Sequence, residues 1–293
     1  MANEVSQVAL ITGCSTGIGR ATALRLAKGG LVVYATARRP ETLQDLEPYG
    51  CRTMALDVCD EASLRAAVEA IEAEHGAVGI LINNAGYGSE GPVEEVSMEE
   101  VRRQFETNLF GLLQLTKLVL PGMRRQRWGK VVNLSSMGGR VTLPGGGIYH
   151  ATKYAVEALS DALRFELRGF GIDVIVIEPG MIRTQFNDTA IRHVDTVGDR
   201  IPDYDAFRLQ VRQNIQDASD GTMARMAGTA DDVARMIARA LVARHPKARY
   251  PVTMHARLFM GSRRWLGDRG WDLFLRGFYT PPQPASGSEE VRP

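Results

Sequence analysis

The sequence is poor in cysteine and has no long hydrophobic run. Among its 293 residues there are three cysteines, Cys14, Cys51 and Cys59, with no Cys-x-x-Cys pair. An odd number of isolated cysteines argues against a disulfide framework and fits the reducing cytoplasm, where we expect the protein to reside. No run of about 18 apolar residues is present, so we expect no transmembrane segment. The first residues lack a charged segment followed by a long apolar stretch, so we expect no signal peptide.

Strong charge and metal-ligand spacing are absent as well. The formal net charge is +1, whereas nucleic-acid-binding domains usually carry a basic stripe, so we expect no nucleic-acid partner. The five histidines are scattered without the spacing of a metal site, and we expect no bound metal. A hydrophobic content of 44% and a charged content of 24% are typical of a globular protein.

Short apolar segments alternate with longer segments of helical periodicity. The apolar segments read as strands covered on both faces of a parallel sheet: Val8–Thr12, Leu31–Thr36, Thr53–Leu56, Ile80–Asn83, Lys130–Leu134, Asp173–Glu178 and Arg249–Val252. The helical segments are Gly17–Lys28, Asp60–Glu74, Ser97–Arg125, Tyr149–Gly169 and Asp231–His245. Ser97 and Thr229 precede acidic residues and predict helix N-termini. The alternation predicts an α/β fold over residues 1–254, with a single doubly wound (Rossmann) parallel sheet of about seven strands and helices on both faces.

Two segments lie outside this alternation. Residues 181–228 form an insertion after the sixth strand, in which Tyr204, Phe207, Val211 and Ile215 recur at helical spacing and predict an amphipathic helix. Insertions at the carboxyl ends of strands usually shape a ligand crevice. Residues 255–280 form a C-terminal helical extension, and the Pro-, Ser- and Glu-rich residues 281–293 are expected to be disordered.

Three interpretations of the extension, which is rich in aromatic residues and arginine, are open. The simplest is that it packs on the core. Alternatively, it covers the substrate crevice or clasps a second subunit, or it lies on a membrane surface. The membrane interpretation is the weakest, because the arginines are not confined to one face: Arg257, Arg263, Arg264, Arg269 and Arg276.

A glycine-rich loop, Thr12-Gly-Cys-Ser-Thr-Gly-Ile-Gly19, follows the first strand and opens the first helix. Glycine lets the backbone approach a phosphate, and a helix N-terminus offers free N–H groups and the positive end of the helix dipole. Such a loop alone is a weak signal. Between a strand and a helix at the start of a βαβ unit, it indicates a dinucleotide pyrophosphate site.

The end of the second strand indicates which dinucleotide binds. An NAD site would place an acid there for the ribose hydroxyls, but the segment Tyr34–Arg39 contains none before Glu41. An arginine at this point suits the 2′-phosphate of NADP(H) through a bidentate contact. The alternative is that Arg38 and Arg39 only solvate a turn, and we favour NADP(H) over NAD(H).

Tyr149 and Lys153 lie four positions apart in the sequence, which places both side chains on one face of a helix. A phenol titrates near pH 10, and a neighbouring ammonium lowers that pKa toward the working range of an acid or base. Spacing alone favours a buried tyrosine beside a solvated lysine. The glycine loop reverses this preference, because it places a hydride-carrying cofactor in the same protein.

These motifs, in order with several others, resemble those of the short-chain dehydrogenases/reductases. The series is Thr12-Gly-x-x-x-Gly17-x-Gly19, Asp57-Val58, Asn83-Asn84-Ala85-Gly86, Asn108, Ser136, Tyr149-x-x-x-Lys153 and Pro179-Gly180-x-x-x-Thr184. The resemblance covers about residues 5–252, nearly the whole regular core.

The resemblance implies four catalytic residues. Tyr149 would be the acid in reduction and the base in oxidation, and Lys153 would lower its pKa and hold the nicotinamide ribose. Ser136, preferred to Ser135 for its separation from Tyr149, would hydrogen-bond the substrate carbonyl oxygen. Asn108 would hold a water that feeds protons toward Lys153; the alternative is a structural, helix-kinking amide.

The resemblance also implies the cofactor contacts. Thr184 would bind the carboxamide, whereas Asp57 has the alternative of a turn acid and Asn84 that of a strand-end cap. His150 points about 100° around the helix from Tyr149 and receives no chemical role. The implied set is Gly13, Ser15, Thr16, Gly17, Ile18, Gly19, Arg38, Asp57, Val58, Asn84, Ala85, Gly86, Tyr149, Lys153, Pro179, Gly180, Ile182 and Thr184.

The implied reaction is NADP(H)-dependent hydride transfer to or from a ketone or secondary alcohol. The segment Tyr34–Arg39 and the chain length are most similar to 17-beta-hydroxysteroid and retinol-type dehydrogenases, which favours a lipophilic substrate. The alternatives are a 3-oxoacyl-thioester or quinone reductase, or a non-catalytic NADP(H)-sensing protein on the same fold. Small and apolar residues on the two long helices fit a homo-oligomer, either a dimer or a tetramer.

Overall fold

A seven-stranded parallel sheet forms the centre of the computed structural model, which describes residues 5–196, 198, 200–219 and 227–284. The sheet has the order β3-β2-β1-β4-β5-β6-β9. β2 and β3 are therefore added on one side of β1, and β4, β5, β6 and β9 on the other. Folds of this type bind ligands at this switch point between β1 and β4. The prediction of a doubly wound parallel sheet is confirmed. The strands are β1 (Ala9–Ile11), β2 (Val33–Ala37), β3 (Cys51–Ala55), β4 (Ile80–Asn83), β5 (Gly129–Leu134), β6 (Ile172–Glu178) and β9 (Arg249–Pro251).

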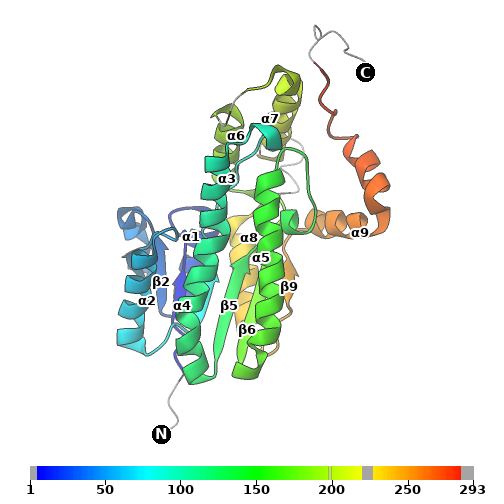
Figure 1. Cartoon of the computed structure of the whole chain (residues 1–293). Helices are drawn as coiled ribbons and strands as arrows, with labels where there is room; N and C mark the ends of the chain where they lie inside the picture. The colour runs from blue at the N-terminus through cyan, green and yellow to red at the C-terminus, as the bar shows by residue number, and fades with distance from the viewer. Residues whose placement is uncertain (1–4, 197, 199, 220–226, 285–293) are drawn as a thin grey trace.

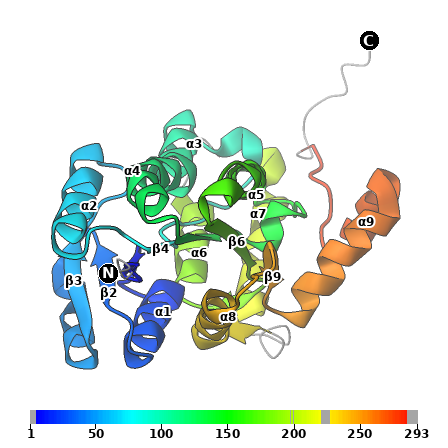
Figure 2. The same cartoon turned by 90° about the horizontal axis from the view of Figure 1, so that it is seen from below.

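Helices cover both faces of the sheet (Figure 2). One face carries α1 (Gly17–Lys28) and α8 (Ala230–Val242), and the other carries α2 (Glu61–His75), α4 (Gly111–Gln126) and α5 (Gly147–Glu166). Each interface between helices and sheet holds its own cluster of buried apolar side chains. Burial on both faces explains why the strands are almost uniformly apolar.

Side-chain caps fix several helix N-termini. The Ser97 hydroxyl accepts a hydrogen bond from the Glu100 amide at the start of α3 (Met98–Phe105), and Thr229 forms a capping box with Asp232 at the start of α8. Both N-termini were predicted from the sequence. The helix predicted for residues 97–125 is also present, and it contains a π-helical turn, η3 (Glu106–Phe110), between α3 and α4.

The insertion after β6 forms two helices above the carboxyl ends of the strands (Figure 1). The predicted helix is α7 (Asp205–Ser219), whereas α6 (Phe186–Thr196) was not predicted. The two helices pack against each other around the buried side chains of Val194, Phe207 and Val211. A two-stranded sheet of β7 (Ile182–Arg183) and β8 (Gly228–Thr229) joins the two ends of the insertion, and it too was not predicted.

The C-terminal extension forms α9 (Met254–Leu275), which bends at Gly267 (φ 60°) and projects from the body of the molecule (Figure 1). The buried Trp271 donates a hydrogen bond from its indole to the Thr142 carbonyl, 3.4 Å away. Beyond the helix, the Thr280 amide donates to Gln210 of α7 at 2.7 Å, and Tyr279 joins the apolar cluster of α6 and α7. The extension therefore packs on the core and also on the helices above the sheet.

Other parts of the extension stay in solvent, since Trp265 is 88% and Leu273 70% exposed. None of the helices in the described ranges is both long and apolar enough to cross a membrane. Within the predicted disordered tail, residues 281–284 have neither helix nor strand, and residues 285–293 lie outside the described residues. The domain boundary at residue 254 and the homo-oligomer remain predictions.

Candidate active site

Glycines shape the loop between β1 and α1. Gly13 (φ 72°) and Gly17 (φ 58°) adopt left-handed backbone conformations that side chains disfavour. A Cβ atom at Gly19 would lie 2.4 Å from the Gly13 carbonyl oxygen, so only glycine fits the contact between helix and loop. Helix α1 begins at Gly17, and the predicted contacts Ser15, Thr16 and Ile18 lie in the same turn. Free helix amides and close backbone approach fit the pyrophosphate of a dinucleotide.

Asn84 ties this loop to the end of β4. Its side-chain amide donates to the carbonyl oxygens of Thr12 (2.8 Å) and Gly13 (3.0 Å). In return, the Thr12 hydroxyl accepts from the backbone amides of Asn84 and Ala85, both at 3.0 Å. The Asn84 side chain thus acts as the strand-end cap that the sequence left as an alternative. The direct cofactor contact of Asn84 stays a prediction.

Arg38 follows β2 with an exposed side chain, and within the described ranges no residue forms an ion pair or hydrogen bond with its guanidinium. The Asp57 carboxylate accepts from the Cys59 amide at 3.0 Å, as a turn acid does, and its contact with the cofactor stays a prediction. Val58 beside it is buried. Burial raises the pKa of the Cys59 thiol and the charge of Arg38 opposes this rise, so Arg38 lies near the Asp57–Cys59 turn. A free cation at this point fits the 2′-phosphate of NADP(H).

Three of the predicted catalytic residues meet at the carboxyl end of β5. Ser136 follows the strand, and its hydroxyl accepts from the Gly138 amide at 3.0 Å. Tyr149 and Lys153 lie on α5, and the Lys153 ammonium donates to the Leu134 carbonyl at 2.7 Å. The Lys153 nitrogen is 5.8 Å from the centre of the Tyr149 ring, so both side chains lie on one helix face as predicted.

Burial dominates the protonation of this cluster, and the expected lowering of the Tyr149 pKa by Lys153 stays a prediction. Burial raises the pKa of Tyr149 to about 12, with a hydrogen bond from Ser136 lowering it and the charge of Glu90 raising it further. Burial also lowers the pKa of Lys153 to about 8, against the opposing charge of Glu157. Desolvation disfavours both the phenolate and the ammonium.

Asn108 lies in the π-helical turn and is fully buried. Its carbonyl oxygen accepts from the Tyr87 amide (3.0 Å), and its amide donates to the Tyr87 carbonyl (2.8 Å) and to the Thr152 hydroxyl (3.1 Å). The side chain therefore connects the loop after β4 to α5. These contacts explain the interrupted helix, since π-turns often serve to place a side chain at a functional site. The water-holding role of Asn108 stays a prediction.

The segment after β6 lies over the glycine loop. The Met137 amide donates to the Pro179 carbonyl at 2.8 Å, which places Pro179 and Gly180 beside the Ser136 turn. A Cβ atom at Gly17 would lie 3.5 Å from the Thr184 side chain, and Ile182 is buried in β7. The structure thus brings these predicted cofactor contacts to the same edge of the sheet as the loop after β1.

Two residues of this region, Phe186 and His255, were missed by the sequence analysis. The His255 ring accepts a hydrogen bond from the Met181 amide at 2.8 Å and so links α9 to the segment after β6. The rings of Phe186 and His150 lie 5.3 Å and 5.7 Å from that of Tyr149. Burial lowers the pKa of His150 to about 4, which keeps the imidazole neutral and agrees with its lack of a chemical role. No local sequence pattern marks Phe186 and His255, because their partners are distant in sequence.

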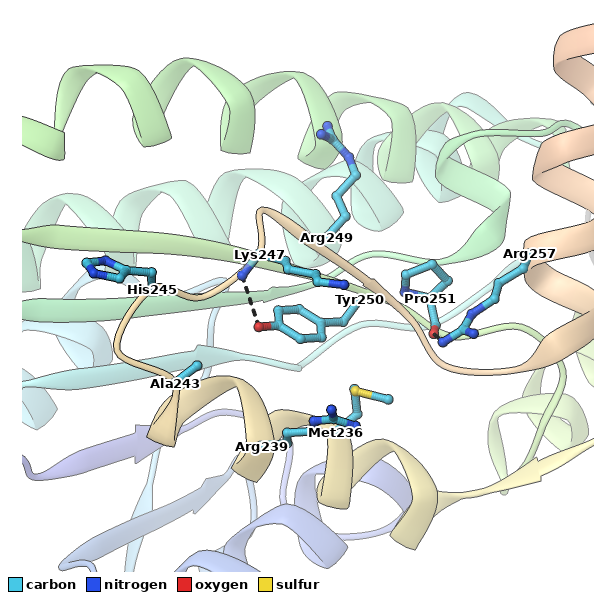
Figure 3. A pocket seen from close by; sticks show the side chains of 9 residues that line it. All are labelled: Met236, Arg239, Ala243, His245, Lys247, Arg249, Tyr250, Pro251 and Arg257. Carbon is cyan, nitrogen blue, oxygen red and sulfur yellow. Dashed lines mark hydrogen bonds between the residues drawn. The ribbon is translucent and has the colours of Figure 1, made fainter.

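A separate hollow lies at the edge of the sheet (Figure 3). It contains none of the predicted site residues, and Arg249 points away from it toward α5, where it pairs with Glu157 at 2.9 Å. We therefore do not assign the substrate to it. The lining residues are Met236, Arg239, Ala243, His245, Lys247, Arg249, Tyr250, Pro251 and Arg257.

Comparisons with known proteins agree with this geometry. Residues 7–195 match the family model described as short chain dehydrogenase. The chain is 38% identical to the 3-ketodihydrosphingosine reductase of Bacteroides thetaiotaomicron over 93% of this chain and 98% of that one. It is 34% identical to the NADPH-dependent 3-dehydrocapnine reductase of Ornithobacterium rhinotracheale, over 90% and 94% of the two chains. The crystal structure of a short-chain dehydrogenase from Streptomyces avermitilis has a TM-score of 0.76 and 33% identity, covering 94% of this chain and 100% of that one.

Proposed function

Because the chain belongs to the short-chain dehydrogenase/reductase family and is therefore a nicotinamide-dependent oxidoreductase, we propose that it reduces a lipophilic ketone with NADPH. The observation that carries the proposal is the convergence of Ser136, Tyr149 and Lys153 beside the segments that carry the predicted cofactor contacts. The reverse reaction, oxidation of the secondary alcohol, uses the same groups.

The proposed roles follow from the chemistry of these side chains. A bound nicotinamide supplies the hydride. Tyr149 donates its phenolic proton to the oxygen of the reduced carbonyl, and the Ser136 hydroxyl donates a hydrogen bond to the same oxygen as negative charge develops on it. Lys153 stabilises the phenolate that remains, because the approaching negative charge on Tyr149 favours the ammonium form.

The preference for NADP(H) is supported by Arg38. Its guanidinium stands at the end of β2, and residues 34–39 contain no acidic side chain to accept the ribose hydroxyls. The relative from Ornithobacterium rhinotracheale is named as NADPH-dependent. Gly13, Gly17 and Gly19 with the N-terminus of α1 would hold the pyrophosphate, and Thr184 the carboxamide.

A lipophilic ketone is supported by the side chains around Tyr149. The Phe186 ring packs against Tyr149, and Tyr279 continues the apolar surface of α7. The Bacteroides relative is named for a ketone substrate, 3-ketodihydrosphingosine. The side chain of Glu90, close to Tyr149, is acidic. An acidic side chain offers no attraction to the anionic carriers of acyl thioesters, so we rank thioester reduction below ketone reduction.

The cofactor assignment is tested with the Arg38→Ala variant. Loss of a charge-assisted contact to a phosphate should weaken NADPH binding roughly 10- to 100-fold while NADH binding changes by less than about threefold. Arg168→Ala, an exposed arginine preceding β6 at the opposite edge of the sheet, serves as the control. Equal losses for both cofactors would contradict the assignment.

The reaction itself is tested by following NADPH oxidation with long-chain ketones, steroid ketones, quinones and acyl thioesters. We expect turnover of the long-chain or steroid ketones. Tight NADPH binding without turnover of any ketone would contradict the proposed function and favour the non-catalytic alternative.

A further inference from the structure

Glu90 lies between the loop after β4 and the N-terminus of α5. The Gly91 amide donates to the Gly145 carbonyl at 2.7 Å, which fixes this loop against the residues that precede α5. A Cβ atom at Gly146 would lie 3.0 Å from a carboxylate oxygen of Glu90. Gly146 is three residues before Tyr149, hence about one helical turn away on the same side of α5. The Glu90 carboxylate therefore stands next to the proton donor.

The surroundings of this carboxylate lack a cation. Within the described ranges, no side chain forms an ion pair with Glu90 and no group donates a hydrogen bond to it. Burial raises the pKa of Glu90 to about 8, and no opposite charge counters this effect. Its titratable neighbours are Tyr149, Tyr279 and the neutral His150. A partly buried carboxyl group without a cationic partner favours its neutral form, and a cation placed beside it would favour the ionised form.

The ionised form of Glu90 acts on the reaction. When Glu90 is ionised, its negative charge raises the pKa of Tyr149, which makes the phenolate that follows proton donation harder to form. A cation bound at Glu90 would neutralise this charge and remove the effect. A metal ion is a poor candidate, because no group of three or more potential ligand side chains gathers anywhere in the described part of the chain. An ammonium group on the substrate needs only the single carboxylate.

We propose that Glu90 determines specificity by binding a protonated amine located next to the carbonyl group of the substrate, so that the protein selects amino ketones over neutral ketones. This inference rests on the proposed ketone reduction at Tyr149. In it, the amine pairs with Glu90 while Tyr149 protonates the neighbouring oxygen. The compound 3-ketodihydrosphingosine is of this class, since a primary amine is attached to the carbon beside its ketone.

The test compares Glu90→Gln with the wild-type protein on two substrates, 3-ketodihydrosphingosine and its N-acetyl derivative, which keeps the ketone and chain but lacks the positive charge. Loss of an ion pair should lower kcat/KM for the amine roughly 10- to 100-fold. For the N-acetyl compound, kcat/KM should stay within about threefold or rise, because the variant no longer raises the pKa of Tyr149. NADPH affinity should be unchanged, which shows that the variant is folded.

Glu99→Gln is the matched control, because Glu99 is an exposed acid of the same region that does not face the site. It should leave both substrates unaffected. An equal fall for both substrates in Glu90→Gln, or no fall for the amine, would overturn the inference while ketone reduction stands. If the wild-type protein reduces neither compound nor any other ketone, the proposed function fails and the inference fails with it.

Discussion

The carboxyl edge of the sheet and the helices above it are held together by different kinds of contact. At the sheet edge, side chains bond to backbone atoms: Asn84 to the glycine loop, Lys153 to the Leu134 carbonyl, Asn108 to Tyr87. Above it, α6, α7 and the end of the extension meet through apolar and aromatic side chains, with Phe207 and Tyr279 at a ring distance of 6.3 Å.

This difference has a functional meaning. Backbone-directed hydrogen bonds fix atoms within narrow limits of distance and angle, as hydride and proton transfer require. Apolar contacts are less directional and tolerate exchange of side chains, which suits a surface that selects substrates. Changes to the catalytic residues and to these backbone-bonded side chains should therefore affect every substrate alike, whereas changes above the sheet edge, or at Glu90, should alter the choice among substrates.

The largest expected effect is that of Tyr149→Phe at the sheet edge. Removing the proton donor should lower kcat by about 10²- to 10⁴-fold for every ketone, with NADPH affinity changed by less than about twofold. Single-turnover and steady-state rates on ketones of different size provide the measurement. Tyr154→Phe, which alters an exposed tyrosine on the same helix, should have no effect. A loss that depends on the ketone would break the distinction between the two regions.

A second prediction concerns the buried charge of Glu178 at the end of β6, which is 2% exposed. Burial and the charge of Glu157 raise the pKa of Glu178 from 4.5 to about 7, against the opposing charges of Arg140 and Arg249. The folded protein therefore binds more protons than the unfolded chain between these pH values. The contribution of Glu178 to the free energy of unfolding should be largest below pH 4.5 and should be lost as the pH rises to about 7.

Denaturant unfolding of Glu178→Gln across that pH range measures this contribution. The wild-type protein should lose stability relative to the variant by up to about 1.4 kcal/mol per pH unit as the pH rises. The exposed Glu166, changed to Gln at the end of α5, provides the control and should leave the slope unaltered. A slope that is the same in all three proteins would show that Glu178 does not titrate in this window.

The smallest effect is expected for Tyr279→Ala above the sheet. Loss of its packing against Phe207 should raise KM up to about tenfold for long-chain ketones, equivalent to about 1.4 kcal/mol, and leave short ketones and NADPH affinity unchanged. KM measured along a series of ketones of increasing chain length tests this. Leu273→Ala, on an exposed part of α9, is the control. A uniform change in KM along the series would contradict a selecting role for this region.

The sheet could be predicted because its signals are local. The near-continuous apolar segments report burial on both faces, and the capping residues Ser97 and Thr229 mark helix starts within a few positions of the bonds they form. The glycine loop could also be predicted from local sequence, because the left-handed backbone of Gly13 and Gly17 depends on the residue type itself.

The remaining features depend on partners far along the chain. The π-helical turn at Asn108 contains no proline or glycine that would predict it. It is stabilised instead by the contacts of Asn108 with Tyr87 and Thr152. Helix α6 and the β7–β8 pair were missed for a similar reason, since they are stabilised by packing rather than by a clear periodic pattern. The state of Tyr149 could not be predicted from its spacing to Lys153, because burial decides its pKa.

The bond between His255 and Met181 has a thermodynamic consequence. Helix α9 begins at this contact beside the segment that carries Thr184, and the chain that follows the helix ends against α7. The extension thus contacts both the segment expected to meet the nicotinamide and the surface expected to meet the substrate. If substrate shifts the position of this element, it changes the affinity for the dinucleotide, and the dinucleotide must change the affinity for substrate by the same factor.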